Sequence, residues 1–182
     1  MTTRYCHTRF PLFSPKGWLL GLLCCAAFFT RAQTPTTANQ VKAVFLFNFS
    51  KFVTWTPEAT NNSPFVIGIL GNDPFGNYID RVVEGEKASG QPIVVQRFDD
   101  VKDIKTCHIL YINKTNGAEI ARSLAGRNIL TVCDADNFAT SGGIVRFYEE
   151  NNHLRLQINV RQAKAAELQI SSKLLRIANV IE

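Results

Sequence analysis

Four short apolar runs in the middle of the chain restrict its fold more than any other feature. They are at most seven residues long and rich in β-branched or other apolar residues, as strands buried on both faces are. Helix-like segments at 74–84, 99–105 and 115–126 follow them. Strands that alternate with helices predict a mainly parallel sheet with right-handed crossovers. The four runs are 65–71 (FVIGILG), 92–98 (PIVVQRF), 107–112 (CHILYI) and 129–134 (ILTVCD).

An aromatic-rich segment before these runs, residues 39–55, predicts a helix. Its apolar residues recur at steps of three and four, and Thr37 with Gln40 has the capping-box pattern of a helix start. Pro57 and the pair Asn61-Asn62 indicate its end. The expected buried stripe consists of Val41, Val44, Phe45, Asn48, Phe49 and Phe52.

The end of the chain has a different pattern. Residues 143–150 and 153–160 flank Asn151-Asn152, and because Asn tolerates positive φ this pair predicts a two-residue hairpin turn. Short helices are expected near 161–166 and from 172 to 180. We therefore expect an α/β protein: a single three-layer domain with a mainly parallel sheet, an antiparallel hairpin near the C-terminus and flanking helices.

The first 32 residues have the pattern of a secretory signal peptide. Basic residues precede an apolar run at 18–29, and Thr30-Arg31-Ala32 resembles a cleavage site. A membrane-spanning helix needs about 20 apolar residues, so the run is too short for one. A lipoprotein anchor at Cys24 or Cys25 is a weaker alternative, since neither follows a small residue of the usual kind. We expect cleavage near Ala32, a domain over residues 33–182 and a location in the periplasm.

Removing this leader changes the charge of the chain. The whole chain carries +5, but four of its 20 basic residues belong to the leader, which has no acidic residue. The remaining domain has 16 basic and 15 acidic residues, a net charge of +1. The basic isoelectric point therefore gives no electrostatic support for nucleic-acid binding.

Two cysteines, Cys107 and Cys133, remain after cleavage. Export would permit a disulfide between them. If their strands are parallel neighbours, however, the offset between them is roughly 13 Å, whereas a disulfide needs Cα atoms within about 7 Å. We expect two buried free thiols.

The chain has no pattern typical of an enzyme, a metal site or a cofactor site. Cys107 and His108 are adjacent in a predicted strand, so their side chains point to opposite faces. The glycines at 71 and 76 lie at a strand-to-helix turn but lack the Lys and Ser/Thr of a phosphate-binding loop. We interpret Asp73 as a helix N-cap and Asp136 as a helix cap. No metal or cofactor is expected.

Polar residues follow the carboxyl ends of three predicted strands, which is where open α/β sheets bind ligands. They provide a hypothesis for a ligand loop, as an alternative to their structural roles. These residues are Asn72, Asp73, Asn113, Asp134 and Asp136.

The first predicted helix has more aromatic residues than one buried stripe can hold. Phe47 lies off the expected stripe, and Lys51 and Trp55 follow it toward the helix end. Packing between two layers would explain this, and so would a surface for a partner protein or a second copy. Phe47, Lys51 and Trp55 are therefore candidates for partner binding.

Five segments occur in order over about residues 38–181: VKAVFLFNFSKFVTW, IGILGNDPFG, CHILYI, LTVCDADNFATSGGIVRFYEENNHLRLQINV and ISSKLLRIANVI. Together they resemble the YfiR family. The resemblance implies an exported regulator that acts in the periplasm of Gram-negative bacteria. It would bind the periplasmic sensor domain of an inner-membrane diguanylate cyclase and hold that enzyme inactive, lowering cyclic di-GMP and biofilm formation. The alternative hypothesis is a periplasmic module that binds a small ligand and has no cyclase partner.

Overall fold

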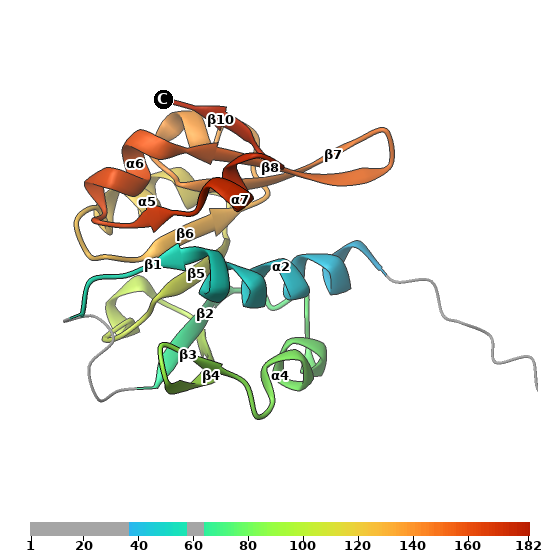
Figure 1. Ribbon diagram of the computed structural model, residues 1–182, viewed down its shortest axis with the longest axis vertical. Coiled ribbons are helices and arrows are strands. Elements are labelled where there is room, and N and C mark those ends of the chain that lie inside the picture. Colours follow the sequence, from blue (N-terminus) through green and yellow to red (C-terminus); the bar gives the residue numbers. More distant parts are fainter. Residues whose placement is uncertain (1–36, 58–63) are drawn as a thin grey trace, which may run out of the picture. The chain divides into compact units, whose positions relative to one another are not determined.

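The computed structural model describes residues 37–57 and 64–182 (Figure 1). The predicted signal peptide lies outside these residues. Eight strands form one sheet in the order β10-β8-β7-β6-β5-β2-β4-β3. Five of them are parallel: β2 (Phe65–Gly71), β4 (Gln91–Phe98), β5 (Ile109–Asn113), β6 (Leu130–Cys133) and β7 (Val145–Glu150).

The apolar runs form the centre of this sheet, as predicted. In β2, Ile67 and Ile69 face one hydrophobic core while Val66 and Leu70 face another on the opposite side. The strands β5 and β6 are buried in the same way. The prediction was wrong for β4, which is buried only at Ile93 and Phe98 because its outer neighbour is the two-residue edge strand β3 (Lys87–Ala88).

Helices cover both faces and make three layers, which confirms the expected fold class. One core includes residues of α2 (Ala38–Phe52), α4 (Asn77–Val83) and α6 (Val160–Ala165). The opposite core includes residues of α5 (Gly117–Ser123) and the fully buried ring of Phe138. Cys107 and Cys133 are buried and unpaired, which agrees with the expectation of two free thiols.

Helix α2 begins as predicted but ends early and buries a different side. Thr37 and Gln40 form both hydrogen bonds of the capping box. The helix ends at Phe52, because the next two residues form β1 (Val53–Thr54), which pairs with β9 (Gln169–Ile170).

The expected stripe on α2 was wrong in part. Val44 is 37% exposed and Asn48 is only half buried, whereas Ala43, Leu46 and Phe47 are buried. The reason is that α2 contacts β5, α4 and the β8 strand at once, so a wide arc of the helix is covered.

Four other expected features differ from the structure. Asp73 is not the N-cap of α4, which begins only after Gly76. Asp136 does not cap a helix either, because a turn follows it and leads to the 3₁₀ turn η3 (Ala139–Ser141). The last helix, α7 (Ser172–Leu175), is shorter than predicted, and β10 (Asn179–Ile181) follows it as an edge strand parallel to β8. The segment expected as a helix near 99–105 is the 3₁₀ turn η2 (Val101–Asp103).

The predicted hairpin is present as β7 and β8 (His153–Asn159). Asn151 and Asn152 have φ of 51° and 62°, as a two-residue turn with positive φ at both positions requires. The turn end of this hairpin extends beyond the neighbouring strands (Figure 1). We call residues 147–156 the arm.

Substitution at Asn152 is expected to test the turn. Asn152→Val would lower the free energy of unfolding by about 1–2 kcal/mol, because a β-branched residue is disfavoured at positive φ. Asn152→Gly should leave it unchanged or slightly higher. Urea unfolding of the two variants measures this difference, and equal stability would contradict the turn geometry.

Candidate functional site

The predicted ligand residues form two separate groups at the carboxyl edge of the sheet. The first lies between β2 and β5, where the chain order of the parallel strands reverses. There Asn113 Nδ2 donates a hydrogen bond to the carbonyl of Asn72 at 2.8 Å. Gly71, at φ +92°, lies so close that an added Cβ would be 2.5 Å from the Asn113 carbonyl oxygen. The two loops are therefore packed together at this point.

Asp73 takes part in a charged network that holds the loop after β2. Its Oδ1 accepts hydrogen bonds from the backbone of Phe75 and Gly76, and its Oδ2 accepts one from Arg97 Nε at 2.8 Å. Arg97 also donates two bonds to Asp80, at 2.7 and 3.1 Å. Hydrogen bonding to Arg97 lowers the pKa of Asp80, and the same bond raises the pKa of Arg97. This network fixes the loop to β4.

The second group is a cluster of opposite charges beyond β6. Lys42, in the first part of α2, places its Nζ 2.5 Å from Asp134 Oδ2. Arg146, on β7, donates to Asp136 Oδ1 and lies over the ring of Tyr148 at 5.4 Å from its centroid. Residues of α2, of the segment after β6 and of β7 thus meet here.

Two polar atoms in this cluster lack hydrogen-bond partners among the residues that the structure describes. They are Asp134 Oδ1 and Arg146 Nε, and both are inaccessible to solvent. Tyr111 lies nearby on β5 and is almost fully buried. Burial raises the pKa of the Tyr111 hydroxyl, and the Asp134 carboxylate raises it further.

An open hollow of about 350 Å³ lies beside this cluster. Its lining combines charged groups with the edge of the arm. The lining residues are Lys42, Asp134, Asp136, Arg146, Phe147, Tyr148, Glu149 and Leu154. Of the predicted ligand residues, Asp134 and Asp136 therefore share a hollow, and Asn72, Asp73 and Asn113 do not line it.

Sequence reasoning missed Lys42 and Arg146. The available signal was weak: each is a basic residue next to apolar neighbours in its element. The partner of Lys42, Asp134, comes 92 residues later in the sequence, just after β6. The partner of Arg146, Asp136, comes 10 residues earlier, before β7. Such pairs depend on how the elements pack.

The three candidates on α2 have different environments. Phe47 and Trp55 are 8% and 7% exposed, and Trp55 Nε1 donates a hydrogen bond to the His108 carbonyl. Lys51 is half exposed, and its ammonium lies 4.1 Å from the centre of the Phe47 ring and 3.8 Å from Glu86. A charge placed at Phe47 is thus expected to disturb folding as well as any contact.

Cys107 and His108, which come just before β5, are held by contacts inside the core. Cys107 Sγ donates to the carbonyl of Ile109, and burial raises the pKa of the Cys107 thiol to about 12. His108 Nδ1 accepts a hydrogen bond from the backbone of Val66 at 2.9 Å, and its ring stacks on Phe65. Within residues 37–57 and 64–182, no group of three His, Cys, Asp or Glu side chains could hold a metal ion.

Removing the charge of Asp134 tests the ion-pair cluster. Asp134→Asn is expected to lower the free energy of unfolding by about 1–2 kcal/mol, because the mostly buried Lys42 loses its counter-charge. Urea unfolding measures the change. Asp136→Asn is the matched control, because the Asp136 side chain is largely exposed, and an equal loss of stability in both variants would contradict the assignment.

In comparisons with known proteins, the chain matches one family model and is distantly similar to a solved structure. No curated protein matches the chain at a significant level. A solved structure, an ABC domain in complex with L-Trp from Streptococcus pneumonia, shares 12% identity with a TM-score of 0.49. The alignment covers 79% of this chain and 60% of that one, so the chain spans less than two thirds of its length.

The match to a known family is more extensive. Residues 39–179 match the family described as YfiR/HmsC-like, and this range includes nearly every described element. It agrees with the resemblance noted in the sequence over about residues 38–181. No helix within the described part of the chain is long and apolar enough to cross a membrane. The chain belongs to the YfiR/HmsC-like family.

Proposed function

We propose that this chain is an exported protein that binds the periplasmic sensor domain of an inner-membrane diguanylate cyclase and keeps that cyclase inactive. The observation that carries the proposal is the family match over residues 39–179, because the family suggests a periplasmic regulator of cyclic di-GMP signalling. The signal-peptide pattern of residues 1–32 supports the same cellular location.

The environment of the reactive side chains supports a binding role over a catalytic one. The thiol of Cys107 and Nδ1 of His108 are both engaged in hydrogen bonds inside the core. Family membership is consistent with this, since the family suggests regulators. Of the three candidates on α2, Lys51 has the side chain that a partner could contact without rearrangement of the core.

Binding of a small ligand is the second candidate function. The hollow of about 350 Å³ favours it, because Asp134, Asp136, Lys42 and Arg146 place charges of both signs around one space. A ligand there would lie against both α2 and the arm. The two functions are compatible, since occupancy of the hollow would alter the surface that a partner meets.

Deletion of the gene is expected to raise cellular cyclic di-GMP and surface attachment several-fold, because the partner cyclase is released. Mass spectrometry of nucleotide extracts measures the first effect, and crystal-violet staining measures the second. Unchanged levels in a strain that expresses the partner cyclase would contradict repression.

Complementing the deletion strain with two forms of the gene tests whether the protein acts in the periplasm. The full chain should restore low cyclic di-GMP, whereas residues 33–182 without the leader should not, because they remain on the wrong side of the inner membrane. Immunoblots of both forms control for expression. Equal rescue by the leaderless form would contradict action in the periplasm.

A further inference from the structure

The β7 strand runs past the end of its neighbour β6. The last residue pair between them is Cys133 with Arg146, while the pairing of β7 with β8 continues to Glu150 and His153. After Cys133 the strand ends, and residues 135–138 form a bend and a turn. Residues 147–150 of β7 therefore have no neighbouring strand on the β6 side within the described residues.

The hydrogen-bond register shows which backbone groups are exposed at this edge. Asn159 N donates to the Ile144 carbonyl, so these two residues form a hydrogen-bonded pair of the antiparallel ladder. Such pairs recur at every second residue, which assigns Arg146, Tyr148 and Glu150 to bonding with β8. The N–H and C=O of Glu149 consequently point away from β8, toward the open edge.

The hollow of about 350 Å³ lies along this edge, and Phe147, Tyr148 and Glu149 form part of its lining. Asp134 and Asp136, from the segment that follows β6, also line it. The hollow thus lies where another strand beside β7 would continue the line of β6. An extended peptide is the shape that fits such a position.

The charges around the hollow favour a basic side chain. Lys42 is paired with Asp134 and Arg146 with Asp136, whereas Glu149 is exposed and has no ion-pair partner among residues 37–57 and 64–182. The five charged lining residues sum to −1. A second copy of the chain would bring an equally acidic edge to this one, and like charges across strands are unfavourable.

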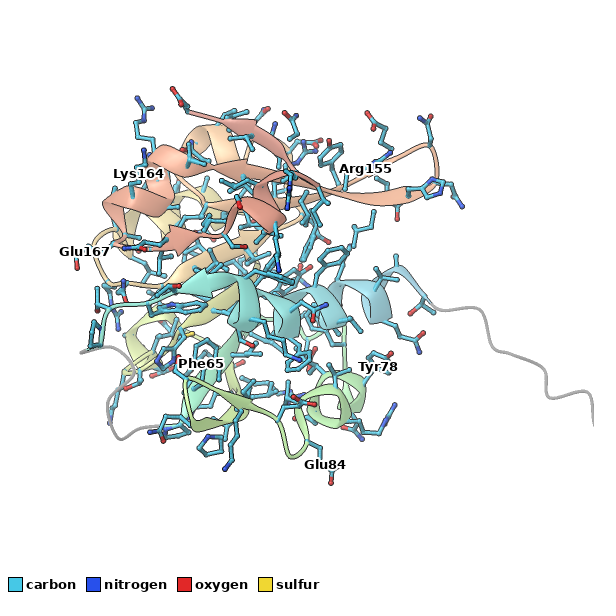
Figure 2. The ribbon with its side chains drawn as sticks, in the orientation of Figure 1. Phe65, Tyr78, Glu84, Arg155, Lys164 and Glu167 are labelled. Carbon is cyan, nitrogen blue, oxygen red and sulfur yellow. The ribbon has the colours of Figure 1, made fainter. Side chains whose placement is uncertain are left out.

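We infer that the edge of β7 at residues 147–150 accepts an extended segment of a partner protein as an added strand. Backbone bonds to Glu149 would hold the segment, and a Lys or Arg side chain would meet the carboxylate of Glu149. The inference takes one point from the proposed function, namely that the binding partner is a protein. The partner strand would occupy the free side of the arm, whose exposed Arg155 lies on β8 (Figure 2).

Peptides selected from a displayed random library against the purified exported chain provide the probe. We expect the selected sequences to contain Lys or Arg within a β-prone segment and to perturb the amide NMR signals of residues 147–150. Glu149→Pro removes the outward N–H without removing a bond to β8, so it should weaken binding about tenfold. Failure to select any binding peptide, or perturbations confined to another surface, would overturn the inference.

Two charge variants distinguish a specific contact at the β7 edge from a general effect of net charge on peptide binding. Glu149→Lys should weaken binding of the selected peptides by about tenfold or more, because it reverses the free charge at the hollow. Glu150→Lys makes the same change in net charge, but Glu150 pairs with Arg155 and belongs to the residues bonded to β8. It should leave binding within about twofold. Equal losses in both variants would overturn the inference.

Thermal melts identify any variant that fails to fold. If Glu149→Pro melts early, Glu149→Lys, which keeps the backbone N–H, decides the result. In cells, a full chain with Glu149→Pro that still lowers cyclic di-GMP would overturn the docking mode and leave the proposed function standing. If the wild-type chain has no effect on cyclic di-GMP but its peptides still map to residues 147–150, the proposed function fails and the docking edge stands.

Discussion

The central strands of the sheet are apolar on both faces, and this constraint governs the rest of the structure. In β2, alternate residues such as Ile67 and Leu70 enter different cores, so neither face can be left in water. At about 25 cal/mol for each Å² of buried apolar surface, exposure of one face would cost more than the stability of a typical domain. Helices must therefore cover both sides. Helix α2 covers one side, and α5 with the ring of Phe138 covers the other.

The position of α2 has consequences at the carboxyl edge of the sheet. Because α2 lies against β5 and the β7–β8 hairpin, its first part brings Lys42 to Asp134, while Phe45 and Phe49 pack on the ring of Phe147. The same helix thus supports the root of the arm by apolar contact and neutralises the carboxylate beside it. Opposite charges at the cluster are paired within the chain, whereas Glu149 on the open edge is exposed and has no ion-pair partner in the described part of the chain.

These features fit a protein that acts by binding. At the switch point between β2 and β5, where many α/β proteins hold ligands, Asn113 donates a hydrogen bond to the carbonyl of Asn72. The hollow with charges of both signs lies elsewhere, along the part of β7 that extends beyond β6. A regulator needs a surface of this kind, because it acts by recognising another molecule.

Much of the architecture was predictable because it depends on local patterns. Runs such as FVIGILG specify buried strands by composition, and Asn151-Asn152 specifies a hairpin because both residues tolerate positive φ. The capping box of Thr37 and Gln40 depends on residues three apart and was likewise predictable. Candidate residues such as Asp134 and Asp136 could be placed at the correct edge of the sheet, since carboxyl ends of parallel strands lie together.

The remaining features depend on contacts between distant segments. The buried side of α2 could not be predicted from its own periodicity, because α4, β5 and β8 together decide which residues are covered. Residues 179–181 form a strand rather than a helix because β8 offers a free edge for pairing. Lys42 meets Asp134 across 92 residues of sequence, and the free edge of β7 exists only because β6 ends first. Local periodicity carries no information about the contact between Lys42 and Asp134 or about the free edge of β7, because the packing of the whole domain determines both.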